Sequence, residues 1–210
     1  MADPRSGQVV DMNEIEIKIA LRTDQDVKNA FELCRSVCNV EPEVTSQRDI
    51  YFDTRDESLR GQDFVVRLRT VGNRTKLALK SPRRFSHGSI SNRIELEFTV
   101  AETEVREQLR TSDLQAVAEI EKRRTEFVAE QATVAIDELP FIGAFIEIEA
   151  RSAELVETMT SKLELTRSNS TPENYTELLE RFLSSNGLPI RPNLKVTFEA
   201  EASWQQSRPR

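Results

Sequence analysis

Charged side chains stand at alternate positions in several apolar segments of this chain. Near its start, Glu14, Glu16 and Lys18 alternate with Ile15 and Ile17. Successive side chains of a β-strand point to opposite faces, so in an extended segment the three charges share one face. Carboxylates in such a row can bind a hard divalent cation, and a lysine can bind phosphate oxygens. The spacing therefore indicates a strand with one face able to do ionic chemistry.

Charged rows of this kind recur in five later segments, and each later row carries one sign of charge. For any single row, a solvated strand face is the simpler interpretation. Six rows together favour a different interpretation, in which the charged faces line the inside of the fold and meet a partner of opposite charge. The reason is that neighbouring charges of the same sign repel unless a partner neutralises them. The later rows are Arg67 and Arg69, Lys76 and Lys80, Glu95 and Glu97, Lys122 and Arg124, and Glu147 and Glu149.

The basic and acidic rows require different partners. Burying such groups unpaired costs several kcal/mol each. A polyanion would neutralise the basic rows, whereas Mg²⁺ or Mn²⁺ would suit the acidic ones, since these cations prefer oxygen ligands and also bind phosphate. A triphosphate with its metal ions satisfies both sets at once. The carboxylates concerned are those of Glu14, Glu16, Glu147 and Glu149.

The alternating segments predict eight antiparallel strands in one α+β domain. A closed barrel of eight strands removes both sheet edges and can hold side chains or one small ligand inside. Helices are predicted over 24–38, 102–110, 153–165 and 173–186, packed on the outside against the apolar strand faces. The strands are predicted over 14–21, 47–53, 63–70, 75–81, 93–99, 120–128, 133–137 and 144–150.

Polar segments flank this domain. Residues 1–12 are predicted to be a disordered leader, 13–200 a single domain and 201–210 a polar tail, with a last alternating stretch at 194–201 read as a strand or part of the tail. His87, the only histidine, lies in a polar loop and is interpreted as solvated, because a catalytic triad needs a placed nucleophile beside it. Trp204 in the tail receives no role.

The composition argues against several classes of protein. The net charge of −7 over 210 residues argues against a nucleic-acid or anionic-membrane binder, since these usually carry a net positive surface. The sequence has no membrane-spanning apolar run, and its N-terminus lacks the hydrophobic region of a signal peptide. The only cysteines, Cys34 and Cys38, are interpreted as core residues of a protein in a reducing compartment. We expect a cytoplasmic protein, and the outward apolar strand faces are compatible with a homodimer.

Eight motifs follow one another along the chain. They are Glu14-x-Glu16-x-Lys18, Arg48 to Thr54, Arg67-Leu68-Arg69, Leu79 to Pro82, Glu95-Leu96-Glu97, Lys122-x-Arg124, Asp137, and Glu147-x-Glu149. This ordered set resembles the CYTH family, also called the triphosphate tunnel metalloenzymes, which includes class IV adenylyl cyclases, thiamine triphosphatases and inorganic triphosphatases. The stretch from Asn174 to Leu179 is similar to the family's C-terminal helix, so the resemblance covers about residues 13–186.

The resemblance implies an eight-stranded tunnel that binds a small-molecule triphosphate on basic strands and two metal ions, Mg²⁺ or Mn²⁺, on acidic ones. The implied metal ligands are Glu14, Glu16, Glu147 and Glu149, with Asp137, Glu95 and Glu97 as additional ligands or water-positioning groups. The implied phosphate-binding residues are Lys18, Arg48, Arg67, Arg69, Lys80, Lys122 and Arg124, with Lys76 on the face of Lys80. The implied catalytic residues are Glu14, Glu16, Lys18, Glu147 and Glu149. Lys162 and Arg167, from the C-terminal part of the chain, are weaker candidates for phosphate contacts.

Three functions are compatible with such a tunnel. Attack of water on the terminal phosphorus makes a triphosphatase, whereas attack of a ribose 3′-hydroxyl on the α-phosphorus makes an adenylyl cyclase. A chain that lost turnover would be a polyphosphate-binding module. Class IV cyclases carry a His-Phe pair upstream of the Glu-x-Glu-x-Lys motif, where this chain has Val10 to Asn13. The sequence therefore favours a metal-dependent hydrolase of inorganic tripolyphosphate, a nucleoside triphosphate or thiamine triphosphate.

Overall fold

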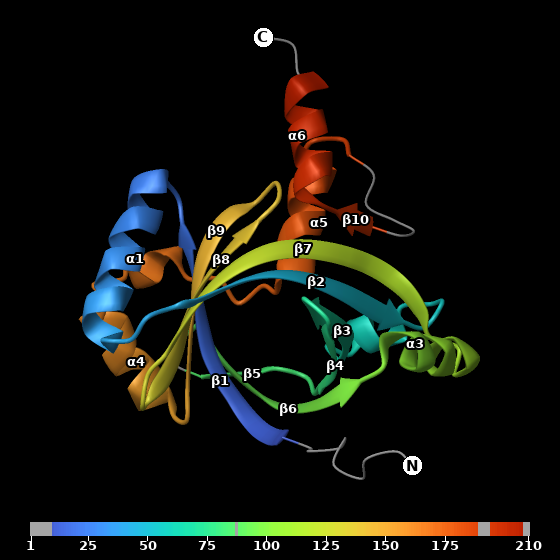
Figure 1. The fold of residues 1–210 in the computed structure, drawn as a ribbon, viewed down its shortest axis with the longest axis horizontal. Helices are drawn as coiled ribbons and strands as arrows, with labels where there is room; N and C mark the ends of the chain where they lie inside the picture. The colour runs from blue at the N-terminus through green and yellow to red at the C-terminus, as the bar shows by residue number, and fades with distance from the viewer. Residues whose placement is uncertain (1–9, 87, 189–193, 208–210) are drawn as a thin grey trace.

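Eight antiparallel strands close into a barrel, which confirms the predicted fold class. The structure, a computed structural model, describes residues 10–86, 88–188 and 194–207 (Figure 1). The strands around the barrel are β1 (Val10–Leu21), β9 (Gly143–Ala150), β8 (Ala132–Leu139), β7 (Gln115–Val128), β2 (Glu43–Asp53), β3 (Val65–Val71), β4 (Arg74–Lys80) and β6 (Ile90–Val100). Pairing of β6 with β1 closes the sheet.

Two short strands extend this barrel. β5 (Arg84–Ser86) pairs with β6 and lies directly before His87, where the sequence predicts a polar loop. β10 (Leu194–Val196) runs parallel to β7 and pairs with residues 118–120. β8 pairs with β7 only from Arg123 onward, so β10 covers part of the β7 edge that β8 leaves open.

The period-two pattern assigns one face of β1 to the core and the other to the barrel interior. Ile15, Ile17 and Ile19 are buried in the hydrophobic core on the outer side of the barrel. Glu14 and Glu16 therefore face inward. A register slip of one residue would move the isoleucines into the interior, so the apolar face decides which charges line it.

Helices cover the outside of the barrel on opposite sides. α1 (Asp24–Cys38) and α4 (Ala153–Lys162) lie together at one side, and α3 (Glu102–Thr111) lies at the other (Figure 1). Thr23 starts α1 with a capping box, in which its side chain accepts from the Asp26 amide and the Asp26 carboxylate accepts from the Thr23 amide. Cys34 and Cys38 are buried in this helix as free thiols, in agreement with their predicted core role.

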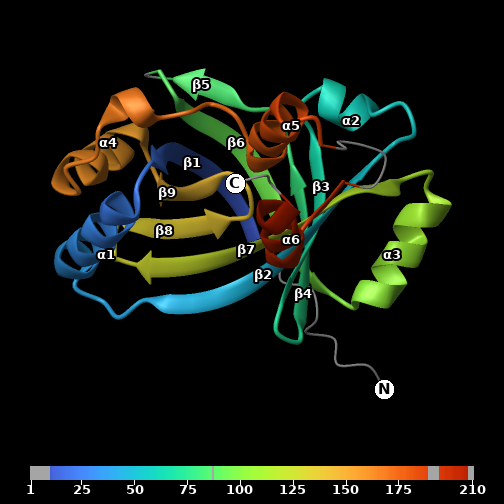
Figure 2. The same cartoon turned by 90° about the horizontal axis from the view of Figure 1, so that it is seen from above.

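One further helix, α5 (Tyr175–Ser185), brings the C-terminal part of the chain to the barrel interior. Asn174 caps it, with Glu177 completing a second capping box. Seen from above, α5 lies between the α1 and α4 side and the α3 side (Figure 2). Two short elements, α2 (Ser58–Gly61) and the 3₁₀ helix η1 (Arg167–Asn169), complete the connections, and α2 was not predicted.

Over Phe198–Ser207 the structure differs from the predicted C-terminal end. The chain forms α6 (Phe198–Ser207) where the sequence analysis expects a strand or tail and then a polar tail from 201. Thr197 explains the change, because its hydroxyl accepts from the Ala200 amide and its carbonyl accepts from the Glu201 amide at the helix start. Trp204 of α6 packs between Phe141 and Phe182, with both ring-centroid distances 5.7 Å.

The predicted leader and loop are only partly described. β1 begins at Val10, inside the predicted leader, whereas residues 1–9, His87 and 208–210 lie outside the described residues. The interpretation of His87 as solvated therefore stays a prediction. Among the helices that the structure describes, none is both long and apolar enough to cross a membrane.

Candidate active site

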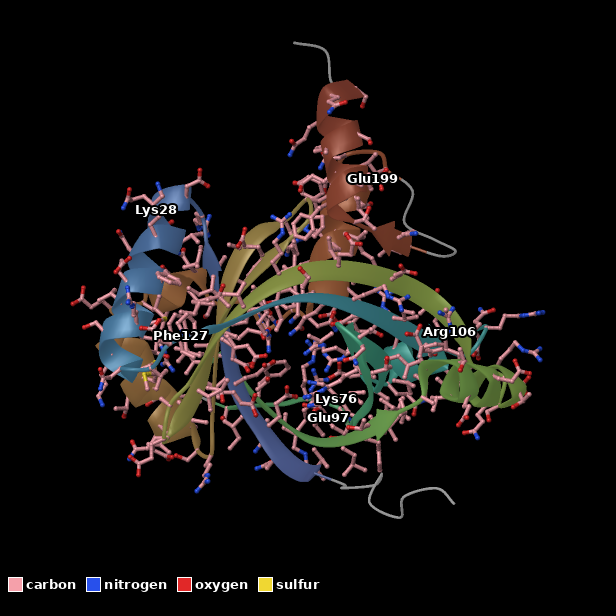
Figure 3. All side chains as sticks on the ribbon, viewed as in Figure 1. Lys28, Lys76, Glu97, Arg106, Phe127 and Glu199 are labelled. Carbon is pink, nitrogen blue, oxygen red and sulfur yellow. The ribbon has the colours of Figure 1, made fainter. Side chains whose placement is uncertain are left out.

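The barrel encloses a cavity of about 550 Å³, and most of the predicted site residues line it. They come from six strands whose inward faces the alternation defines. Lys76 and Glu97, labelled in Figure 3, lie beside each other on neighbouring strands, with Lys76 Nζ 2.8 Å from Glu97 Oε2. The predicted residues that line the cavity are Glu14, Glu16, Lys18, Arg67, Arg69, Lys76, Lys80, Glu95, Glu97, Lys122, Arg124, Glu147 and Glu149.

Arg48 does not line this cavity, so the structure corrects its predicted place. Its Nη2 donates to both oxygens of Glu102 on α3, at 2.8 and 2.9 Å. Arg48 shares its face of β2 with Ile50, which is buried in the core cluster beside α3 and does not line the cavity. Asp49, and not the predicted Arg48, occupies the inward position on this part of β2.

Asp137 faces inward but lies behind the cavity wall, with no exposed surface. Its carboxylate accepts hydrogen bonds from Lys122 Nζ at 2.8 Å, from Arg124 Nε and Nη2 at 2.7 Å each, and from the Tyr175 hydroxyl at 3.0 Å. These donors hold its pKa below the usual range although burial opposes this. Asp137 thus holds Lys122 and Arg124 in place in this structure, and its role as a metal ligand stays a prediction.

The two weaker candidates lie away from the cavity. Lys162 is exposed at the end of α4, and Arg167 pairs with Glu157, with Nη2 and Oε1 3.1 Å apart. Neither residue lines the cavity.

The basic side of the cavity is held in place by Asp49. Arg69 binds this carboxylate through Nε and Nη2, at 2.7 Å each, and Arg67 Nη1 lies 3.9 Å from it. Burial would raise the pKa of Asp49, but the charges of Arg69 and Arg67 hold it well below the ordinary value. Burial and the charge of Arg124 together lower the pKa of Lys122 to about 7, although Asp137 opposes them. The fixed guanidinium groups thus present an electropositive wall.

Carboxylates on β1 and β9 form the opposite side, and two of them are paired with cations. Glu14 accepts from Lys80 Nζ at 2.6 Å and from Arg93 Nε at 3.1 Å. Burial acts to raise its pKa, but the charges of Lys80 and Arg93 lower it to about 2. Glu147 pairs with Lys18, with Oε1 and Nζ 3.2 Å apart, and also accepts from Arg124.

Glu16 and Glu149 both line the cavity, have no hydrogen bond or ion pair with a described residue, and are opposite each other in the β1–β9 pair. Burial and the neighbouring charge of Glu14 raise the pKa of both, that of Glu149 to about 7. In the described part of the chain, no three His, Cys, Asp or Glu side chains converge to form a metal site by themselves. Mg²⁺ usually takes one or two carboxylates and completes its shell with phosphate oxygens and water. The pair of opposed glutamates fits such an ion.

Three buried side-chain atoms of the described residues have no hydrogen-bond partner, and all three belong to residues that line the cavity. They are Gln47 Oε1, Arg67 Nε and Arg93 Nη1. Buried polar groups are nearly always satisfied in folded proteins, so each such atom needs an explanation. Two of the three are guanidinium donors, which indicates an anion as the missing partner.

Sequence reasoning missed several residues of this site. Asp49 and Tyr51 share the inward face of β2, and Arg93 shares the face of Glu95 two residues later, so the same alternation could have found them. Tyr175 carries no such signal. The centroid of its ring lies 4.4 Å from Lys18 Nζ and 5.4 Å from Lys122 Nζ. Only the packing of α5 against the barrel brings the ring to this position.

Comparison with solved structures finds proteins of the same fold. A protein from Pyrococcus horikoshii, PH1012, is 18% identical with a TM-score of 0.66, over 79% of this chain and 98% of its own. A candidate adenylate cyclase from Vibrio parahaemolyticus is 17% identical with a TM-score of 0.66, over 80% of this chain and 98% of its own. HpAC1 from Hippeastrum, a candidate adenylyl cyclase with a dominant triphosphatase activity, is 21% identical with a TM-score of 0.52, over 91% and 96%.

At these identities the solved structures show a shared fold. No curated protein matches the chain. The family model of the CYTH domain matches residues 12–182, which is most of the chain and includes every strand of the barrel except the first residues of β1. The chain therefore belongs to the CYTH family.

Proposed function

We propose that this protein hydrolyses the terminal phosphoanhydride bond of a triphosphate with the help of Mg²⁺ or Mn²⁺. One observation carries the proposal. Cations from β3, β4 and β7 and carboxylates from β1 and β9 face each other across a single cavity of about 550 Å³. Such a cavity matches a ligand that is itself a polyanion with bound cations.

The basic wall would bind the phosphate chain. Arg67 and Arg69 are kept rigid by Asp49, so their remaining donors are pre-organised for phosphate oxygens. Lys80 and Lys18 are paired with carboxylates in the free protein, and a triphosphate would compete for these ammonium groups. Binding therefore exchanges internal ion pairs for contacts with the substrate.

Glu16 and Glu149 would hold the divalent ion. Burial and neighbouring carboxylates disfavour the charged form of both residues in the free protein, and a cation held by them would offset this cost. A bound Mg²⁺ or Mn²⁺ supplies charge neutralisation of the phosphate oxygens and lowers the pKa of coordinated water. The wall residues would orient the substrate around this site and keep bulk water out.

In the proposed reaction, water forms a bond to the terminal phosphorus while the bond from that phosphorus to its bridging oxygen breaks. The bridging oxygen keeps the electron pair, and the protons of the water pass to the phosphate products and solvent. Guanidinium groups of the basic wall would stabilise the charge that develops on the leaving phosphate. The dominant triphosphatase activity of HpAC1 supports hydrolysis over cyclisation for this chain.

The test is a product analysis. Purified protein is incubated with Mg²⁺ or Mn²⁺ and either tripolyphosphate or ATP, and the products are identified by phosphorus NMR. Orthophosphate that depends on the metal supports hydrolysis, with an EDTA-treated sample as the control. Cyclic AMP and pyrophosphate as products would show that the protein is a cyclase and not a hydrolase. Tight binding without any product would show that it is a polyphosphate-binding module.

A further inference from the structure

Arg93 is a cavity residue outside the predicted set. It lies on β6 directly opposite Glu14 of β1, and only 8% of it is exposed. Besides the main cavity, it lines a neighbouring space of about 10 Å³, together with Lys18 and Ser91. Arg93 therefore lies where the acidic strand β1 meets the basic groups.

The guanidinium group of Arg93 is only partly used inside the protein. Its Nε donates to Glu14 Oε2 at 3.1 Å, whereas its Nη1 is buried and has no hydrogen-bond partner among the described residues. Leaving a buried donor unpaired costs free energy, and the cost is larger when the group is charged. Such a cost is accepted at a site where a ligand later supplies the acceptor.

Holding Glu14 in place does not explain this arrangement. Lys80 of β4 already donates from its Nζ to Glu14 Oε1 at 2.6 Å. A residue needed only to neutralise Glu14 would not have to keep a second, unpaired donor buried in the cavity wall.

We propose that Arg93 is a phosphate-binding residue, in which Nε anchors Glu14 and Nη1 donates to an oxygen of the bound triphosphate. This inference rests on the proposed function, because it assumes a phosphate ligand in the cavity. It adds a basic residue on β6, a strand that otherwise contributes Glu95 and Glu97 to the wall.

The test measures binding of inorganic tripolyphosphate by calorimetry, without divalent metal and with EDTA present, so that turnover plays no part. We expect Arg93→Gln to raise the Kd roughly 10- to 100-fold, the effect of losing one charge-assisted hydrogen bond. Arg93→Lys keeps the charge but cannot serve both acceptors, so it should fall between. Arg123→Gln is the matched control, since it removes one positive charge from an exposed position of β7.

A double-mutant cycle separates direct binding from an effect through Glu14. In a Glu14→Gln background, Arg93→Gln should again raise the Kd; no further change would overturn direct binding. Thermal unfolding verifies that each variant is folded. If Arg93→Gln does not fold, Arg93→Lys is used in its place. If the wild type binds tripolyphosphate and both Arg93 variants bind it equally well, only the Arg93 inference fails. If the wild type does not bind it, the proposed function fails as well.

Discussion

Glu16 and Glu149 stand directly opposite each other in the antiparallel pair of β1 and β9, and both side chains line the cavity. Opposed like charges destabilise a sheet, and burial adds to that cost. Burial and the charge of Glu14 raise the pKa of both glutamates, and the charge of Glu16 adds to the rise for Glu149. The free protein therefore keeps two carboxylates in an arrangement that favours the binding of a cation.

Replacing one of these glutamates should separate stability from activity. We expect Glu149→Gln to raise the Tm of the metal-free protein by about 2–4 °C, which corresponds to about 1 kcal/mol in a domain of this size. The reason is that the amide removes a charge from the pair. The same variant should lose metal-dependent turnover of tripolyphosphate, and Mg²⁺ should no longer raise its Tm. Differential scanning calorimetry with and without Mg²⁺ measures both thermal effects.

Glu138→Gln is the control for this experiment, because Glu138 lies on the neighbouring strand β8 and is exposed. It should leave the Tm, the effect of Mg²⁺ and turnover unchanged. Full metal-dependent activity in Glu149→Gln would contradict the assignment of Glu149 to the metal site.

Arg69 should contribute mainly to substrate binding. Its guanidinium group binds Asp49 in a fork and lines the cavity. Arg69→Ala is expected to raise the KM for tripolyphosphate roughly 10- to 100-fold, because a charge-assisted contact to phosphate is lost. Steady-state kinetics at saturating metal measures the change, and an unchanged KM and kcat would show that Arg69 does not contact the substrate.

Arg48→Gln is the contrasting variant. Arg48 lies on the other face of β2 and binds Glu102 outside the cavity. We expect its KM to stay within about twofold of the wild type, while stability falls by about 1 kcal/mol through the lost ion pair. A KM as poor as that of Arg69→Ala would mean that the side chain reaches the phosphate after all.

The different placement of these two arginines shows what the sequence can predict. In β1 and β9, charges occupy one face and isoleucines the other, so alternation alone assigns the inward residues. In β2 the alternation places Arg48 on the face of the buried Ile50 and Asp49 on the opposite face, so it could have assigned Asp49 inward. The partner of Arg48 outside the cavity, Glu102 of α3, lies far away in the sequence and is not part of that pattern.

Residues distant in sequence account for the other differences. The sequence predicts Asp137 as a metal ligand. In the folded protein its carboxylate accepts a hydrogen bond from the hydroxyl of Tyr175 on α5, which is 38 positions away in the sequence. The ranges of α1 and α5 were predicted closely, and the capping box that starts each of these helices is a local feature of the sequence. Helix α6 was missed because Thr197 starts it directly after an alternating stretch, which favours a strand.

Asp49 should make the stability of the protein depend on pH. Its pKa in the folded protein is held below the unfolded value of about 3.9 by Arg69 and Arg67. The carboxylate therefore stabilises the fold above that value, and this stabilisation is lost as the pH falls through the folded pKa. Asp49→Asn should lower the free energy of unfolding by about 3 kcal/mol at neutral pH, because one partner of a buried ion pair is removed. Near pH 2.5 the difference should be clearly smaller.

Urea denaturation of both proteins at the two pH values measures this difference. Asp113→Asn serves as the control, since Asp113 is exposed and has a φ of 60°, which asparagine tolerates. A difference between wild type and Asp49→Asn that stays constant from neutral to acid pH would contradict the proposed charge pairing.

The C-terminal helix should stabilise the barrel through Trp204. This half-buried side chain packs on Phe182 of α5 and on Phe141 in the turn between β8 and β9. We expect Trp204→Ala to lower the free energy of unfolding by about 2 kcal/mol, less than the 3–5 kcal/mol for a fully buried aromatic residue. Trp204→Phe should lose less than half of that, because most of the ring contact remains. Unfolding is followed by circular dichroism, since Trp204 is the only tryptophan and its removal abolishes the fluorescence signal. Equal stability of all three proteins would show that α6 adds nothing to the fold.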